Sequence, residues 1–336
     1  MEKSFDIKLR RIVADSSCRD FILADAKDAD MGFGLAAPGK NPAAQPGRPQ
    51  YRSLAEYRQF MRDIVKQGLV DIMLMSVSAN EQLTIRERLF DDSHVTPAVR
   101  ANDTTDIWLG ESGDYKHEPS LAFRTTTIEH AQCGRARVDS PADRKLGADL
   151  GLYSITFNND ARIDREALER YREFRVEAEL KGFRHFLEVF APNAPVRPIK
   201  DVGRFVNDHI VRAVAGAPSA SRPLFLKMPY FGPAAMEALV NYDPTLVVGI
   251  LGGSSGTTHD AFRMLWEAKK YGARAALFGR KINNAEDQLT MVKLLRAVAD
   301  DELLPDEAVR VYHSELTKLG IPAQRPLADD LALSQV

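Results

Sequence analysis

The sequence predicts an α/β protein in which eight strand–helix units close into a TIM (β/α)8 barrel. Short apolar or β-branched runs alternate with longer amphipathic segments along most of the 336 residues, as in parallel βαβ units. A glycine-rich segment, residues 252–256, follows the seventh predicted strand. A doubly wound open sheet usually has its phosphate loop after the first strand instead, so the barrel is favoured.

Strands are expected where short apolar runs are bounded by Gly, Pro, Asn or Asp. These runs are residues 21–25, 69–76, 106–110, 148–157, 185–191, 223–231, 246–252 and 275–279. Helices are expected where apolar residues recur three and four positions apart. These segments are residues 53–67, 78–90, 164–181, 199–215, 233–240, 258–271 and 285–299. Ser53 is the expected N-cap of the first helix, and Gly182 closes the helix over 164–181.

We expect one barrel domain over residues 1–330, with an N-terminal extension and a long polar loop region at 110–148. Residues 331–336 are expected to form a loose tail. The loop over residues 31–50, rich in Gly, Pro and Asn, is long enough to be functional rather than a plain connection.

Composition argues against several classes of protein. Lys and Arg number 45 against 47 Asp and Glu, so the basic excess of a nucleic-acid-binding protein is missing. No uncharged apolar stretch approaches the ~18 residues that span a bilayer, and the N-terminus lacks the apolar core of a signal peptide. Two distant cysteines, Cys18 and Cys133, and seven scattered histidines predict neither a disulfide framework nor a metal site. We expect a cytoplasmic protein with no nucleic-acid, membrane or metal partner.

Lys227 is the only charged residue in the apolar run over 223–231. Burial in such a strand disfavours the ammonium form relative to the neutral amine, and the neutral amine is a nucleophile. The alternative is a lysine that reaches out from the strand end and pairs with a carboxylate.

Three further polar residues lie in predicted strands. Glu188 is a lone charge in the run over 185–191; it is either an acid/base group that serves the amine or the structural ion-pair partner of Lys227 or an arginine. Asp25 ends the first strand and is either a site carboxylate or a loop cap. Tyr153 offers a hydroxyl for proton relay, or is a buried structural tyrosine.

Two loops predict a phosphate site. Gly252, Gly253 and Ser254 follow strand seven and open a helix, where backbone N–H groups can approach an anion closely. Gly279 and Arg280 follow strand eight, and an arginine side chain offers a forked donor to phosphate oxygens. In barrels, the loops after strands seven and eight frequently share one phosphate.

Together these residues indicate Schiff-base chemistry. A neutral lysine amine forms an iminium with a ketone, and the iminium accepts electrons when the adjacent C–C bond breaks. A phosphate held one or two strands away would fix the carbonyl against the amine. This chemistry requires no metal and no organic cofactor.

The chain resembles the class I aldolases of the group containing tagatose-bisphosphate, archaeal-type fructose-bisphosphate and deoxyribose-phosphate aldolases, with the closest likeness to tagatose-bisphosphate aldolase. The likeness covers about residues 145–300. It is carried by Phe-Leu-Glu-Val at 186–189, Phe-Leu-Lys-Met-Pro at 225–229 and Gly-Arg at 279–280, with a thinner echo at 22–25.

This resemblance implies that Lys227 forms the imine, that Glu188 is the acid/base and that Asp25 lies in the mouth of the barrel. It also implies that Gly253 and Arg280 bind phosphate. The chain departs from the family at Leu152, which aligns with a further lysine on strand four. The loops at 31–50 and 110–148 do not align either.

The sequence therefore predicts a lyase that cleaves or forms a C–C bond in a phosphorylated ketose through a Schiff base on Lys227. A small sugar phosphate is its expected partner. Two alternatives remain, namely a barrel that binds a phosphorylated ligand without catalysis, and a sugar-phosphate isomerase or epimerase. A homo-oligomer is compatible with the sequence, which shows no interface signature.

Overall fold

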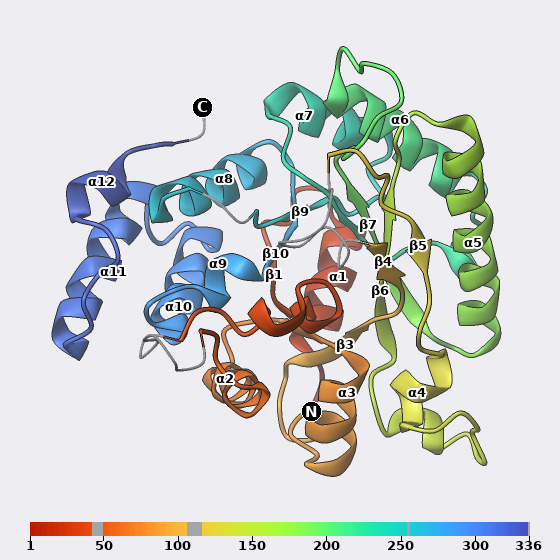
Figure 1. The fold of residues 1–336 in the computed structure, drawn as a ribbon, viewed down its shortest axis with the longest axis horizontal. Helices are drawn as coiled ribbons and strands as arrows, with labels where there is room; N and C mark the ends of the chain where they lie inside the picture. Colours follow the sequence, from red (N-terminus) through yellow and green to blue (C-terminus); the bar gives the residue numbers. More distant parts are fainter. Residues whose placement is uncertain (42–49, 106–115, 254–255, 335–336) are drawn as a thin grey trace.

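The computed structural model describes residues 1–41, 50–105, 116–253 and 256–334, and its centre is a ring of eight parallel strands (Figure 1). The strands are β1 (Ile22–Lys27), β2 (Ile72–Met75), β3 (Thr96–Arg100), β6 (Leu150–Thr156), β7 (Arg184–Phe190), β8 (Leu226–Lys227), β9 (Gly249–Leu251) and β10 (Ala275–Phe278). Their order is β8-β7-β6-β3-β2-β1-β10-β9, and a bridge between Met228 and Ile250 joins β8 to β9. The predicted TIM barrel is confirmed.

Helices surround the strands, with α5 and α6 on one side in Figure 1 and α8 and α10 on the other. The helices are α1 (Ser4–Ala14), α2 (Leu54–Gln67), α3 (Val77–Asn80), α4 (Ile128–Cys133), α5 (Ala161–Leu180), α6 (Val202–Ala215), α7 (Pro233–Tyr242), α8 (Thr258–Lys270), α9 (Arg280–Asn283), α10 (Gln288–Ala299), α11 (Pro305–Leu319) and α12 (Leu327–Leu331). Ser53 is the N-cap of α2, as predicted, in a capping box with Glu56. No described helix is long and apolar enough to cross a membrane.

The third strand of the barrel comes earlier in the chain than the sequence predicted. The third strand of the barrel is β3, which pairs with β2 and β6, whereas the predicted residues 106–110 lie outside the described part of the chain. Pro97, the second residue of β3, obscures this strand in the sequence, because a proline within a short run argues against a strand.

Side chains alternate along each barrel strand between the interior and the helices. The interior cluster includes Ala24 and Ala26 of β1 and Leu152 of β6, together with Phe5 of α1. Helix α1 lies across the N-terminal ends of the strands, since the backbone N–H of Ser4 donates to the carbonyl of His94, just before β3. The N-terminal extension thus closes the bottom of the barrel, and the carboxyl ends of the strands form its mouth.

Two peripheral segments differ from a plain loop and a loose tail. Within the 110–148 region, β5 (Ala122–Phe123) pairs antiparallel with β4 (Asp103–Thr104), and α4 follows. Residues 331–334 are hydrogen-bonded to the start of α8: the carbonyl of Ala332 accepts from the Thr257 hydroxyl (2.8 Å), and the backbone N–H of Ser334 donates to Asp260 (3.0 Å).

Candidate active site

Lys227 and Glu188 form an ion pair at the mouth of the barrel. Strand register places them opposite each other on β8 and β7, and opposite residues on neighbouring strands point the same way. Lys227 Nζ lies 2.6 Å from Glu188 Oε1, with the two side chains 10% and 2% exposed. Lys227 and Glu188, each the lone charge of its predicted strand, are therefore ion-pair partners. The ion pair is the structural interpretation of both residues, and their position at the mouth is also compatible with the functional one.

The backbone that carries Lys227 is held on both sides. Leu226 donates its N–H to Val247 (2.8 Å), and Met228 donates to Gly249 (3.1 Å). On the other side, Leu226 and Lys227 pair with Leu187 and Glu188 of β7. The lysine therefore projects from a fixed strand, and only its side chain is free to move.

A hydroxyl completes the surroundings of Glu188. Ser154 of β6 lies opposite Glu188, and its Oγ donates to Glu188 Oε2 at 2.7 Å. Asn102, just after β3, fixes Ser154 in turn: its Oδ1 accepts from the Ser154 N–H (2.7 Å) and its Nδ2 donates to the Ser154 carbonyl (2.9 Å). Each carboxylate oxygen of Glu188 thus has a partner, and such support holds a site group in one orientation.

A cavity of about 540 Å³ opens above this pair, which is a typical volume for a small-molecule site. Lys227 and Glu188 line it together with the predicted phosphate-loop residues Gly252, Gly253, Gly279 and Arg280. Ser254, the remaining predicted member, lies outside the described residues. The structure therefore brings six of the predicted site residues to one cavity.

Close packing explains two of the cavity glycines. A Cβ on Gly252 would lie 2.2 Å from the ring of Phe278, and one on Gly279 would lie 2.8 Å from the carbonyl oxygen of Ala26. Any side chain at these positions would push the loops after β9 and β10 away from the barrel wall. Backbone N–H groups can approach a ligand closely only where such side chains are missing.

Arg280 belongs to the mouth and contacts the first loop. Its guanidinium carbon lies 5.1 Å above the ring of Phe33, and Gly32 and Phe33 also line the cavity. The described part of the 31–50 loop thus reaches the candidate site. Stacking on an aromatic ring holds a guanidinium in a defined plane.

Asp25 does not lie in the mouth, in contrast to the prediction. Ala24 and Ala26 face the interior, so Asp25 points to the helices on the other face of β1. It is fully buried there and pairs with Lys27, whose Nζ lies 2.9 Å away. Burial raises the pKa of the Asp25 carboxyl and lowers the pKa of the Lys27 amine.

Lys27 is a second buried lysine on a barrel strand, but it cannot reach the cavity. Its side chain is 0% exposed, and its Nζ donates to Oδ1 of Asn283 on α9 at 2.6 Å. Asn283 in turn donates to Tyr57 of α2 (3.4 Å). This network ties β1 to the surrounding helices, which is a structural role.

Tyr153 also faces the helices rather than the mouth. Its ring centroid lies 4.7 Å from that of Phe174 and 5.1 Å from that of Tyr171, both on α5. Burial raises the pKa of Tyr153 to about 12, so its hydroxyl keeps its proton at neutral pH. The structure therefore gives Tyr153 a packing position and places Ser154, the next residue, at the site.

Sequence reasoning missed two charged residues of the cavity, Asp28 and Arg100. Asp28 follows β1 on the interior face, and its Oδ2 lies 3.4 Å from Nη1 of Arg100 at the end of β3. The Arg100 Nε donates to the carbonyl of Asn102 (3.0 Å). The two alanines at 24 and 26 were the available signal, since strict alternation from them selects residue 28.

The position at which the resemblance noted in the sequence would place a further lysine is apolar in the fold. Leu152 is fully buried in the interior cluster. It lies two residues before Ser154 on β6 and therefore on the same face of the strand. The only amine on a cavity-lining residue is that of Lys227, within the described residues. Across the same described ranges, no three His, Cys, Asp or Glu side chains are grouped so that they could hold a metal ion.

Comparison with known proteins identifies the fold. No protein-family model matches the chain, and no curated protein matches it by sequence. The structure is similar to that of a Schiff-base-forming fructose-1,6-bisphosphate aldolase, with a TM-score of 0.61 and 15% identity, over 88% of this chain and 99% of the other.

Two further solved structures are similar to the same degree. One is an archaeal fructose 1,6-bisphosphate aldolase, with a TM-score of 0.61 and 16% identity over 87% of this chain and 98% of the other. The second is a fructose-bisphosphate aldolase from Slackia heliotrinireducens, with a TM-score of 0.62 and 14% identity over 91% of each chain. At these identities the likeness shows a shared (β/α)8 barrel.

Proposed function

We propose that the protein is a class I aldolase that uses Lys227 to form a Schiff base with a phosphorylated ketose. The observation that carries this proposal is the contact between Lys227 and Glu188 at one cavity with Gly253 and Arg280. Amine, carboxylate and anion-binding loops are the three parts that the reaction requires. The fold shared with aldolase structures agrees with this assignment but does not carry it.

The two loops proposed to bind phosphate follow the next two strands after the one that carries Lys227. Gly252 and Gly253 follow β9, which adjoins β8, and Arg280 follows β10, the next strand. A phosphate held there lies to one side of Lys227. The substrate chain then extends from the phosphate across the lysine, with its carbonyl carbon next to the amine.

In the proposed reaction, Lys227 gives its proton to Glu188 and its neutral Nζ adds to the ketone carbon. The carbinolamine loses water as Glu188 returns the proton to the leaving hydroxyl, which leaves the iminium. Glu188, ionised again after the loss of water, then takes the proton of the hydroxyl on the second carbon from the iminium carbon, and the bond between the first and second of these carbons breaks. Its electron pair flows into the iminium to give an enamine, while the aldehyde departs. Protonation of the enamine and hydrolysis restore the free lysine.

Ser154, on the fourth strand of the barrel (β6), lies beside Glu188. Its hydrogen bond to Glu188 Oε2 leaves Oε1 directed at Lys227. We assign Ser154 as a positioning residue that keeps Glu188 aligned for proton transfer. The closer likeness to tagatose-bisphosphate aldolase remains a prediction from sequence, and the substrate class proposed is a phosphorylated ketose.

Borohydride trapping tests this proposal. Incubation with dihydroxyacetone phosphate or with ketose bisphosphates, followed by borohydride, should reduce the iminium and add the ketone's mass to the peptide containing Lys227. The peptide containing Lys27 serves as an internal control, because that amine is sealed from the cavity. An unmodified Lys227 across a panel of ketose phosphates would contradict the proposal.

The absence of a lysine from β6 supports a second candidate, a barrel that binds a sugar phosphate without cleaving it. The variant Lys227→Met separates the two. If wild type and variant bind the same ketose phosphate equally and neither turns it over, the binding barrel is correct. If isomerisation is measurable while borohydride leaves Lys227 unmodified, the lysine acts as an acid or base in an isomerase.

A further inference from the structure

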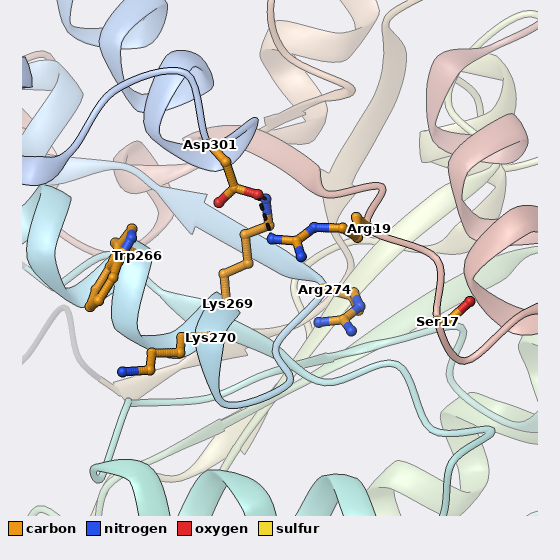
Figure 2. A pocket seen from close by; sticks show the side chains of 7 residues that line it. All are labelled: Ser17, Arg19, Trp266, Lys269, Lys270, Arg274 and Asp301. Carbon is orange, nitrogen blue, oxygen red and sulfur yellow. Dashed lines mark hydrogen bonds and ion pairs between the residues drawn. The ribbon is translucent and has the colours of Figure 1, made fainter.

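A second cavity has a volume of about 370 Å³, and Figure 2 shows the side chains that line it. Its lining includes Arg19, three residues before β1, and Arg274, the residue before β10. Because all barrel strands are parallel, residues before the strands lie at the bottom and the candidate active site lies at the top. Neither cavity shares a lining residue with the other.

The charges around this lower cavity are strongly unbalanced. Arg19, Lys269, Lys270 and Arg274 line it, and Asp301 is the single carboxylate among its lining residues. Asp301 is shared, since its Oδ2 accepts from Lys269 Nζ and from Arg19 Nη2, both at 2.8 Å. Figure 2 shows these three side chains meeting. The lining therefore has a net charge of +3, and like charges this close repel one another.

One edge of the Arg274 guanidinium has no partner within the described ranges. Its Nε donates to the carbonyl of Cys18 (3.1 Å) and its Nη1 to the carbonyl of Ala273 (3.0 Å). Its Nη2 has no hydrogen-bond partner among the residues that the structure describes, and no carboxylate pairs with the guanidinium there. Burial lowers the pKa of Arg274, and the nearby charge of Arg19 adds to this effect.

Helix electrostatics explain only part of this cluster. Lys269 and Lys270 occupy the last turn of α8, where cations interact favourably with the helix dipole. Lys270 also lies 5.2 Å above the ring of Trp266. Arg19 and Arg274 come from other elements and gain nothing from that helix end. Their convergence on the same cavity therefore indicates a negatively charged ligand.

We propose that this lower cavity binds a compact diphosphate, either inorganic pyrophosphate or the diphosphate group of a nucleotide. At about 30 Å³ per water-sized group, the cavity holds roughly a dozen such groups, enough for the nine non-hydrogen atoms of pyrophosphate. The forked donors of two arginines match phosphate oxygens. A trivalent anion would neutralise the +3 lining. The cavity's small, concave outline suits a metabolite better than a nucleic acid, and the chain as a whole has a net charge of −2.

Isothermal titration calorimetry at fixed ionic strength tests this proposal on the full chain. The parent protein for the titrations is Arg280→Gln, which weakens phosphate binding in the mouth. Pyrophosphate should bind it saturably, and adding Arg274→Gln should weaken binding at least tenfold. Lys270→Gln, which replaces an exposed side chain, should weaken pyrophosphate binding several-fold. If Arg274→Gln fails to fold, the titration of Lys270→Gln is the test. Arg212→Gln removes the same charge from the last turn of α6 and should leave binding unchanged.

A parallel titration with ADP distinguishes the two sources of the diphosphate. Tighter binding of ADP than of pyrophosphate indicates a nucleotide as the ligand, and the reverse indicates the inorganic anion. Either result supports binding in the lower cavity if Lys270→Gln weakens the binding of that ligand. The proposal is overturned if neither ligand binds saturably to Arg280→Gln. It is also overturned if the lower-cavity variants bind within twofold of their parent. None of these outcomes depends on aldolase activity, so the two proposals are tested separately.

Discussion

The buried pair of Lys227 and Glu188 predicts an asymmetric double-mutant cycle. Lys227→Met leaves Glu188 buried, with the Ser154 hydroxyl as its one remaining hydrogen-bond partner among the described side chains. Removal of one partner of a buried ion pair typically costs about 3–5 kcal/mol, because an uncompensated charge stays behind. We expect Lys227→Met to lower the free energy of unfolding by an amount in this range.

Glu188→Gln should cost less. It leaves the Lys227 ammonium at the edge of a cavity open to water, and the new amide can still hydrogen-bond to Ser154. We expect a loss of about 1–3 kcal/mol, the usual cost of an unsatisfied buried polar group. The double variant has no stranded charge, so it should be more stable than Lys227→Met alone. The coupling energy should be about 2–3 kcal/mol.

Urea unfolding of the four proteins at pH 7 measures this cycle, with equal m-values as the check that the denatured states are comparable. The coupling follows from the four free energies of unfolding. The reasoning is refuted if the two single losses add within about 0.5 kcal/mol, the limit for independent sites. It is equally refuted if Glu188→Gln costs more than Lys227→Met, because the carboxylate would then not be the more strongly buried charge.

Three further predictions follow from the site and its surroundings. Gly252→Ala should destabilise the fold by about 1–3 kcal/mol, since the new Cβ would meet the Phe278 ring at 2.2 Å; an unchanged urea midpoint would contradict this. Ser154→Ala should lower turnover about tenfold, the value of one hydrogen bond of ~1.4 kcal/mol, and should shift the pH profile of kcat, whereas Ser154→Thr should restore both; equal profiles would show that the hydroxyl does not position Glu188. Burial lowers the pKa of His185 to about 3, so the unfolded chain binds a proton that the folded chain excludes, and stability should fall as the pH drops from ~6.5 toward 3. His185→Gln should flatten this slope by up to about 1.4 kcal/mol per pH unit; identical slopes between pH 7 and pH 5 would contradict it.

The strands of this barrel made its charges visible in the sequence. Parallel strands are covered on both faces and read as continuous apolar runs, so a lone charge such as Lys227 or Glu188 stands out. The glycine-rich loops were likewise visible, because the carboxyl ends of parallel strands meet at one rim. For this reason six residues that were predicted from sequence alone line the same cavity.

The same apolar runs hid the direction in which each side chain points. Asp25 and Tyr153 lie in strands that are apolar on both faces, so a polar–apolar alternation does not separate interior from exterior there; in the first strand, only the small side chains of Ala24 and Ala26 mark the interior face. The first strand also continues to Lys27, two residues beyond the predicted end. The strand was predicted to end at Asp25, and the resemblance implied that Asp25 lies in the mouth, whereas the true end brings Asp28 there.

Strand register, that is, which residues of neighbouring strands lie opposite each other, could not be predicted from the sequence. Strand pairing brings Ser154 of β6 beside Glu188 of β7, 34 residues away in the sequence. Asn102, just after β3, contacts Ser154 from 52 residues away. An isolated serine or asparagine in a single sequence has no pattern that marks such a role. Only the pairing of distant strands assigns it.

The anchoring of Lys227 has a consequence for redesign. Its amine is carried by a strand that is hydrogen-bonded on both sides, whereas Phe33 and Arg280 are presented by segments outside the strands. Residues in these segments can be exchanged, or the segments lengthened, while the strand that carries Lys227 keeps its position. With Lys227 in the proposed Schiff-base role, libraries directed at the rim would change which carbonyl compounds reach its amine, and the strand residues would stay untouched.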